Sequence, residues 1–374
     1  MLSDAQRAAY ERDGFIVVPD VFLPAEIEEL RRVTDEFVRN AMSVSANDEI
    51  YDLEDTHSAR EPRVRRLKAP HLHHDTYFRA SRNAKVVAIL KDLWGTVRFD
   101  TGKLNMKSAG YGAPVEWHQD WAFYPHTNDD LAAVGIMLDD VDSENGPMLV
   151  VPGSHKGPVW DHHGPNGRFC GAIDPANLAS SGGDLDVSRA APCLGKAGSV
   201  TVHHVRAVHG SAANFSGRER RFLLFQYRAA DAWPLLGFKD GIEKFDELLL
   251  AGEPTLEPRL AAVPVRLPLL VAELREALYP PLAPFANHWH ERLHLEPRFP
   301  ARLDAYLARC HAAGQQRPTP LILKYEAGDY NCLHQDLYGE LVFPIQATVL
   351  LSKPGEDFTG GEFLLVEQRP RMQS

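Results

Sequence analysis

The stretch WHQDWAFY, residues 117–124, contains the pattern that decides the fold of this chain. Side chains two residues apart in an extended segment point the same way, so His118 and Asp120 can bind one metal ion. A third ligand, His209, would arrive from a distant strand. Two imidazoles and one carboxylate on one face of an octahedron leave the opposite face open, which suits non-haem Fe(II) oxygenases. We therefore predict an iron site formed by His118, Asp120 and His209.

A basic residue follows the third ligand at a suitable distance. Arg220 lies close enough after His209 in the sequence to reach the same site. Its planar guanidinium can offer a carboxylate two parallel hydrogen bonds. A single H-x-D motif is weak evidence, since any surface loop can contain one. The ordered set of three ligands and Arg220 is what makes the pattern informative.

Length and composition limit the remaining possibilities. The 374 residues allow roughly two to three domains, although a barrel or sandwich can use more than about 200 residues as one unit. The hydrophobic fraction of 44% and the charged fraction of 24% are those of an ordinary globular protein. We expect no membrane span, because no apolar run approaches the roughly 20 residues that one needs. The net charge of −11 argues against a nucleic-acid partner.

The cysteines and the N-terminus indicate a reducing compartment. The start of the chain lacks the basic and apolar segments of a secretory signal. The cysteines show neither C-x-x-C pairing nor zinc-finger spacing, which favours free thiols and a cytoplasmic location. They are Cys170, Cys193, Cys310 and Cys332. We interpret the basic run REPRVRRLK, residues 60–68, as a solvated loop, in preference to a segment that binds an anionic substrate.

The periodicity predicts helices first and strands afterwards. Ser3 and Gln6 have capping-box spacing, and the helix that they begin should end at Gly14. A strand over 15–18 and a helix from Pro24 should follow, and 44–66 should be an irregular lid or surface loop. Short strands punctuated by turns then predict a sandwich or barrel. These strands cover residues 98–107, 132–138, 148–151, 198–205 and 221–227.

Four sequence blocks resemble the phytanoyl-CoA dioxygenase family. They are SDAQRAAYERDGFIVVPDVF at 3–22, WHQDWAFY at 117–124, NGPMLVVPGSHKG at 145–157 and HGSAANFSGRERR at 209–221. The resemblance, which covers roughly residues 1–269, implies a mainly β fold with flanking helices, a double-stranded β-helix or jelly roll of the cupin kind. It also implies Fe(II), 2-oxoglutarate as co-substrate and O2 as oxidant.

The same resemblance assigns roles to individual residues. It implies His118, Asp120 and His209 as the iron ligands, and Arg220 with Ser211 as the residues that hold the distal carboxylate of 2-oxoglutarate. Asn105 matches a strand position that contacts this co-substrate. Family members that chlorinate replace the carboxylate ligand with a small residue, and Asp120 is intact. The resemblance therefore favours hydroxylation of a small organic molecule or an acyl thioester, with release of succinate and CO2.

The remaining residues, 270–374, resemble part of a second, prolyl-hydroxylase-like 2-oxoglutarate oxygenase. The block LKYEAGDYNCLHQDLYGELVF at 323–343 contains a second H-x-D motif, His334 and Asp336, and SKPGEDFTGGEF follows at 352–363. No histidine follows Asp336, so we expect an incomplete second site and one catalytic iron. Helices are expected over 269–278, 285–293 and 299–313, and strands over 321–326, 345–351 and 362–366.

Two other functions use the same residues. A zinc-dependent or cupin-like hydrolase or isomerase could employ the same three ligands, but Arg220 and the PGSH block would then have no role. A non-catalytic binding protein that retains the barrel would not need intact ligands. The sequence leaves open the substrate, the oligomeric state, metal binding by His334 and Asp336, and whether the C-terminal segment is a natural fusion, a frameshift or a truncation.

Overall fold

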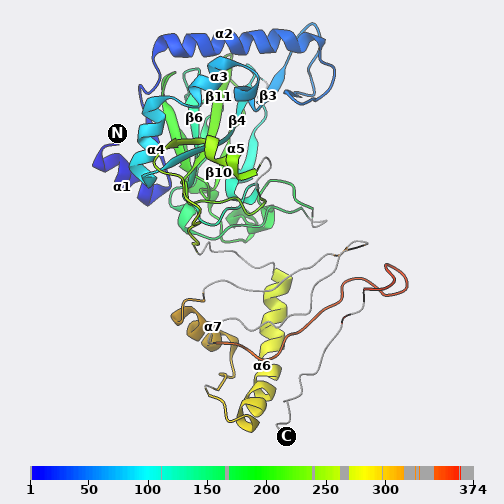
Figure 1. Cartoon of the computed structure of the whole chain (residues 1–374). Helices are drawn as coiled ribbons and strands as arrows, with labels where there is room; N and C mark the ends of the chain where they lie inside the picture. Colours follow the sequence, from blue (N-terminus) through cyan, green and yellow to red (C-terminus); the bar gives the residue numbers. More distant parts are fainter. Residues whose placement is uncertain are drawn as a thin grey trace. The chain divides into compact units, whose positions relative to one another are not determined.

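The computed structural model describes residues 2–110, 112–164, 168–237, 241–261, 269–296, 298–315, 325, 328, 341–361 and 363. The chain divides into two compact units, Met1–Arg266 and Leu267–Ser374, shown in Figure 1. Each unit is described by itself. Within the described residues no helix is long and apolar enough to cross a membrane.

The first helices begin and end where the sequence predicts. In α1 (Asp4–Asp13), the Ser3 hydroxyl accepts a hydrogen bond from the Gln6 backbone N–H at 3.2 Å, and the Gln6 side chain accepts from the Ser3 N–H at 2.9 Å. Gly14 ends this helix with a positive φ of 81°, which glycine adopts without steric cost. Strand β1 (Phe15–Val18) and helix α2 (Pro24–Asn40) follow. These expectations are therefore confirmed.

Two antiparallel sheets make up the rest of the first unit. The larger sheet has eight strands in the order β1-β9-β6-β11-β4-β3-β2, with β12 also paired to β4. The smaller sheet has four strands in the order β5-β10-β7-β8. The strands of the larger sheet after β1 are β2 (Tyr51–Leu53), β3 (Val64–Lys68), β4 (Val97–Lys107), β6 (Leu131–Met137), β9 (Val200–His204), β11 (Arg220–Arg228) and β12 (Leu249–Ala251). Those of the smaller sheet are β5 (Val115–His118), β7 (Met148–Val150), β8 (Ala191–Cys193) and β10 (His209–Ser211).

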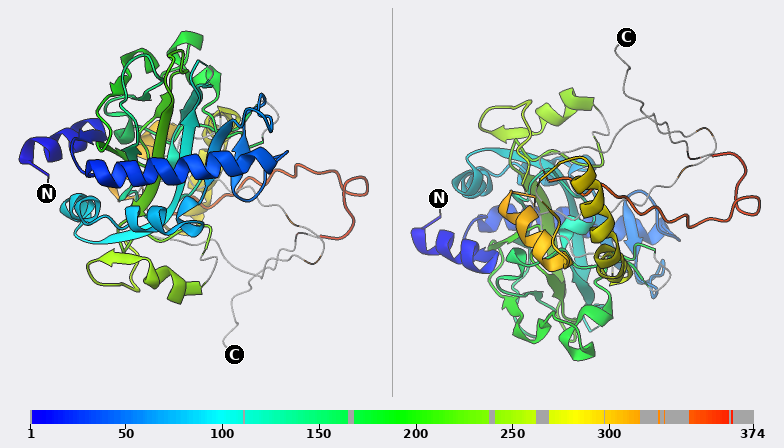
Figure 2. Two further views of the ribbon diagram at one scale, coloured as in Figure 1. Left: turned by 90° about the horizontal axis from the view of Figure 1, so that it is seen from above. Right: turned by 90° about the horizontal axis from the view of Figure 1, so that it is seen from below.

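The helices cover one face of the larger sheet. Apolar residues of α2, α3 (Asp75–Ala80) and α4 (Ala84–Trp94) share one buried cluster with alternate residues of the sheet, among them Leu104 and Leu223. In Figure 2, α2 runs across the strands of this sheet. Burial of this apolar surface, at roughly 25 cal/mol per Å², is the main force that holds the helices on the sheet.

The opposite face of the larger sheet packs against the smaller sheet. Phe222 and Leu224 of β11 form a second buried cluster with Met148 and Val150 of β7 and with Cys193 of β8. Two sheets packed in this way form the double-stranded β-helix that the sequence predicts. The described cysteines Cys170, Cys193 and Cys310 are free, as expected.

The reading of residues 44–66 and of the basic run 60–68 as loops is wrong in part. Both segments contribute strands, β2 and β3, to an edge of the larger sheet. Periodicity missed these strands because they are short and do not alternate: in β3 the buried Val64 and Leu67 are separated by two arginines, Arg65 and Arg66. The basic side chains are therefore held on a sheet.

The second unit contains two described helices, α6 (Leu269–Arg292) and α7 (Leu303–Ala312). The sequence analysis predicted two separate helices here, over residues 269–278 and 285–293. Pro280, Pro281 and Pro284 lie between them, and an interior proline removes a helical hydrogen bond. Instead α6 continues through them, and packing offers the reason, because Tyr279, Ala283 and Ala286 are buried with α7. Tyr279 stacks on Tyr306 with ring centroids 5.4 Å apart.

Other predictions for the second unit have mixed outcomes. The strand expected over 345–351 is absent from the structure, where this described segment has no regular hydrogen-bonded partner strand. The strand over 321–326 lies almost wholly outside the described residues, as does most of that over 362–366. His334, Asp336 and Cys332 also lie outside them.

Candidate iron centre

Strands β5 and β10 bring the predicted ligands together. His118 and His209 are directly opposite each other in this antiparallel pair, and their ring centroids are 4.1 Å apart. Asp120 begins a short 3-10 helix (Asp120–Ala122) just after β5, which places its Oδ1 3.9 Å from His118 Nε2. All three residues are buried, and one ligand atom from each lies within 4.8 Å of the other two.

Both histidines are oriented by the backbone. His118 Nδ1 donates to the Glu116 carbonyl at 2.8 Å, and His209 Nδ1 donates to the Ala207 carbonyl at 2.9 Å. The protons are thereby fixed on Nδ1, and the lone pairs of Nε2 are left for a metal. Burial lowers the pKa of His118 to about 4 and the pKa of His209 well below its usual value. The rings are therefore neutral, as metal ligands must be.

Asp120 provides the negative charge of the site. Burial by itself would raise the pKa of this carboxyl group. The imidazoles of His203 and His209 and the ammonium of Lys103 outweigh that effect, so the pKa lies well below its usual value. Asp120 is thus an anion although it is only 3% exposed. Two neutral imidazoles and one carboxylate are a donor set that fits Fe(II).

Gln119, between the two ligands, anchors the motif. Its Nε2 donates to the carbonyls of Pro158 and Arg206 at 3.1 and 2.7 Å, and its Oε1 accepts from the Trp160 N–H at 2.8 Å. The side chain is completely buried. Sequence reasoning assigned no role to this residue, because only the fold shows which three segments it joins.

Replacing Gln119 with alanine should lower the free energy of unfolding by on the order of 3 kcal/mol, because buried donors and an acceptor lose their partners. Urea denaturation measures the change. Glu116→Ala, at an exposed position of the preceding strand β5, is the control and should alter stability by less than about 0.5 kcal/mol. Equal effects of the two substitutions would contradict an anchoring role for Gln119.

A second group of polar residues lies where β10 and β11 meet the loop before β7. Arg220 is 3% exposed and donates through Nε and Nη2 to the Gly146 carbonyl at 3.1 and 2.6 Å. Lys107, opposite Arg220 in the sheet, donates to the Ala212 carbonyl. A Cβ at Gly146 would lie 2.8 Å from the Ala212 carbonyl oxygen, so these backbones are in close contact.

Ser211 adds an unused hydrogen-bonding group next to Ala212. Its Oγ is buried and has no partner among the described residues. The Nη1 of Arg220 likewise makes no hydrogen bond within the described part of the chain. Burial lowers the pKa of Arg220 only to about 10, so it stays cationic at neutral pH. A buried cation and an unpartnered hydroxyl fit a carboxylate group of a ligand.

Neighbouring arginines are already neutralised. Arg221 forms ion pairs with Asp139 and Asp35, both at 2.7 Å, and Arg218 is exposed and paired with Asp142. Asn105, expected to contact the co-substrate, accepts a hydrogen bond from Arg66 at 3.1 Å. Lys103 and Lys107 lie two residues before and two residues after Asn105 on β4. Because side chains alternate between the two faces of a sheet, all three lie on the same face.

The sequence analysis missed two residues beside the ligands, Lys103 and His203. His203 is completely buried, its Nε2 lies 3.7 Å from Asp120 Oδ2, and its ring centroid is 4.6 Å from that of His209. Alternation along β9 would have found it, because Val200 and Val202 belong to the core under the helices and His203 must face the other way.

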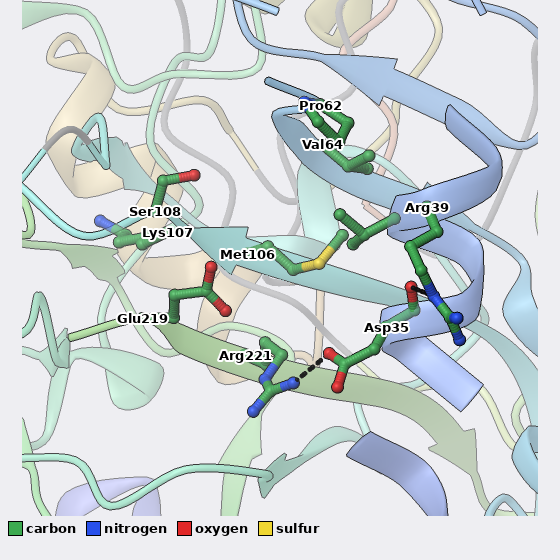
Figure 3. Close-up of a pocket in the computed structure, with 10 residues that line it drawn as sticks. Asp35, Arg39, Pro62, Val64, Met106, Lys107, Ser108, Glu219 and Arg221 are labelled. Carbon is green, nitrogen blue, oxygen red and sulfur yellow. Dashed lines mark hydrogen bonds and ion pairs between the residues drawn. The ribbon is translucent and has the colours of Figure 1, made fainter. Parts of the chain in front are cut away.

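A depression elsewhere on the unit does not contain the ligands. It has a volume of about 210 Å³ and lies between α2 and the β3, β4 and β11 strands, on the outer side of the larger sheet (Figure 3). Arg221 and Asp35 form an ion pair across it. The residues that line it are Asp35, Val38, Arg39, Pro62, Val64, Met106, Lys107, Ser108, Glu219 and Arg221.

Comparisons with known proteins agree with this site. The chain matches the phytanoyl-CoA dioxygenase (PhyH) family over residues 10–222. It is 38% identical over 270 residues to a probable alpha-ketoglutarate-dependent hypophosphite dioxygenase of Stutzerimonas stutzeri, covering 72% of this chain and 92% of that protein. The solved structure of EctD from S. alaskensis with bound Fe has a similar fold, with a TM-score of 0.52 and 23% identity, covering 70% of this chain and 88% of that one.

The C-terminal segment matches a different family. Residues 261–374 match the Oxygenase-NA family, described as an oxygenase catalysing oxidative methylation of damaged DNA. An uncharacterized Mycobacterium tuberculosis protein is 58% identical over 111 residues, which are 30% of this chain and 48% of that protein. The segment thus spans about half the length of this relative, and a second oxygenase-like segment is present as expected.

The matched residues include both strands that hold the histidines and the start of β11 with Arg220. The match to the relative that is 38% identical covers 92% of that protein. The chain therefore belongs to the phytanoyl-CoA dioxygenase family and is a 2-oxoglutarate-dependent dioxygenase that uses iron.

Proposed function

We propose that the unit Met1–Arg266 hydroxylates a small molecule at an iron held by His118, Asp120 and His209. The observation that carries this proposal is the convergence of three buried ligand atoms within 4.8 Å of one another. Each histidine presents Nε2 because its Nδ1 is bound to a backbone carbonyl. Hydrolysis at zinc would not need the buried Arg220 and the unpartnered Ser211 hydroxyl.

The chain contributes orientation and charge to this reaction. Iron and 2-oxoglutarate, when bound, would supply the oxidation by O2, with succinate and CO2 as products. Arg220 and Ser211 would hold the distal carboxylate of the co-substrate through the groups that have no partner in the fold. Phe123 packs against His118 with ring centroids 5.9 Å apart and against Phe169 with ring centroids 5.1 Å apart, so two partly exposed aromatic rings lie on the side of this ligand.

A small substrate is favoured by the relative. A dioxygenase named for hypophosphite shares 38% identity with this chain over 270 residues. The loop that contains Phe169 also bonds the strand of the first ligand, since the Ile173 N–H donates to the Trp117 carbonyl at 2.8 Å. Residues near 158–190 are therefore positioned to affect which molecules reach the site.

Activity should reside in the first unit alone. We expect the whole chain and a variant that ends at Arg266 to form succinate from 2-oxoglutarate at similar rates with Fe(II) and O2, because the two parts are separate compact units. The measurement is succinate formation against a library of small acids and metabolites. Protein reloaded with Zn(II) is the control and should be inactive.

Two results would contradict the proposal. Turnover with Zn(II) and no O2 consumption would favour a hydrolase. Loss of succinate formation in a folded variant ending at Arg266 would show that the second unit takes part in turnover. Folding of the variant is checked by circular dichroism, so that a misfolded fragment is recognised as such.

A further inference from the structure

One basic side chain on the ligand side of the larger sheet has no partner among the described residues. Lys103 lies on β4, opposite Leu224 of β11 and Lys68 of β3. Leu104 and Met106 belong to the core under the helices, and alternation along the strand turns Lys103 to the other face. Leu224 belongs to the cluster that packs against the smaller sheet. Lys103 therefore points to the side of the sheet where the three ligands lie.

The neighbouring cations on this face are neutralised, whereas Lys103 is not. Lys68 pairs with Asp52 at 3.1 Å, and Arg66 pairs with the same carboxylate at 3.4 Å. Arg66 also donates to Asn105. Within the described residues, the ammonium of Lys103 has neither a carboxylate within 4.0 Å nor a hydrogen-bond acceptor. A partly buried ammonium without an acceptor is costly unless a ligand supplies one.

Lys103 also interacts electrostatically with the ligands. Burial lowers the pKa of Lys103, and the negative charge of Asp120 opposes this shift. In return, Lys103 helps to hold the pKa of Asp120 low.

The co-substrate has other partners. Its distal carboxylate is assigned above to Arg220 and Ser211. Arg220 is opposite Lys107, at the end of β4, whereas Lys103 is opposite Leu224. The strand rises about 3.3 Å per residue, so the backbone positions of Lys103 and Lys107 are about 13 Å apart along β4. Lys103 thus starts from a different part of the sheet and is available for another anionic group.

We propose that Lys103 binds the negative charge of the substrate, so that the substrate is a small monoanion, either an oxyanion of phosphorus or a carboxylate. This inference rests on the proposed function of the same site. His203, on β9, has its Nε2 3.7 Å from Asp120 Oδ2, and within the described residues neither of its ring nitrogens has a hydrogen-bond partner. The substrate anion would thus bind beside the carboxylate ligand, between a lysine of one strand and an imidazole of another.

Binding of two probes tests the proposal without turnover. Hypophosphite and propionate are titrated calorimetrically, under anaerobic conditions, into the whole chain loaded with Fe(II) and 2-oxoglutarate. We expect at least one probe to bind the wild type and its Kd to rise about 10- to 100-fold in Lys103→Met, because a hydrogen bond to a charged group is lost. Whichever probe binds identifies the class of anion.

Three further variants make the result specific. Lys103→Arg keeps the charge and should retain most of the binding. Lys91→Met removes an exposed lysine of α4 and should leave Kd unchanged. The Kd of 2-oxoglutarate should stay within about threefold of the wild type in Lys103→Met, since Arg220 holds that ligand.

The proposal would be overturned by lack of binding of both probes to the wild type, by binding that is unchanged in Lys103→Met, or by a loss confined to 2-oxoglutarate. Failure of the proposed function itself looks different. In that case neither the wild type nor Lys103→Met forms succinate from 2-oxoglutarate, with or without a probe. Circular dichroism of Lys103→Met excludes unfolding as the cause of lost binding.

Discussion

Replacing His209 with alanine is expected to reduce iron-dependent decarboxylation of 2-oxoglutarate to the level of the protein-free reaction. The ligand set then loses one of its two imidazoles, and two side chains hold a divalent ion poorly. His118→Ala and Asp120→Ala should have the same effect. Anaerobic titration with Fe(II) measures the loss of iron binding, and an assay for succinate on the same preparations measures the loss of decarboxylation. The variants should remain folded, because the inter-sheet apolar cluster does not include the ligands.

The control for this prediction is His73→Ala, at an exposed position, which should keep full activity and iron content. Retained turnover in His209→Ala would mean that another imidazole replaces the missing ligand. His203 is the candidate, with its ring centroid 4.6 Å from that of His209. The double variant with His203→Phe would then become inactive, and the assignment of the third ligand would have to change.

Arg220→Lys should weaken binding of 2-oxoglutarate about 10- to 100-fold, because one ammonium cannot reproduce the planar fork of a guanidinium toward a carboxylate. Lysine would also lose the two hydrogen bonds to the Gly146 carbonyl that position the side chain. Iron content should be nearly unchanged. The apparent affinity for 2-oxoglutarate is read from the dependence of succinate formation on its concentration.

Arg218→Lys is the matched control, since Arg218 is exposed and pairs with Asp142; its affinity for the co-substrate should equal that of the wild type. An unchanged affinity in Arg220→Lys would transfer the role to Lys107. That residue lies opposite Arg220 in the sheet. Burial lowers its pKa to about 7, so binding through Lys107 would weaken as the pH rises above neutrality, whereas binding through Arg220 would not.

Local sequence patterns predicted the first unit well where they depend on neighbouring residues. The capping box at Ser3, the stop at Gly14 and the proline at the start of α2 each act within one helical turn, and each was found where expected. Strand periodicity predicted only a sandwich or barrel, and the double-stranded β-helix was predicted through the family resemblance. The order of the strands depends on contacts between distant segments, which periodicity does not contain.

The parts that could not be predicted share this dependence on distant contacts. Strands β2 and β3 form because a sheet edge is available beside β4, and not because their own residues alternate strongly. Helix α6 continues through three prolines while its apolar side packs on α7. The proximity of Lys103 and His203 to Asp120 likewise follows from the packing of two sheets, and the sequence gives only the face on which each lies.

The pairing of His118 with His209 has a mechanical consequence. Strand β5 is an edge strand of the smaller sheet, and β10 is its one partner strand among the described residues. A cation shared by the two histidines would be a cross-link across this outermost pair, between segments far apart in the chain, and it would close a long loop whose closure otherwise costs entropy. The metal centre would then also stabilise this edge of the smaller sheet. In protein that has lost its metal, the hydrogen bonds between β5 and β10 would open before those of the other strands.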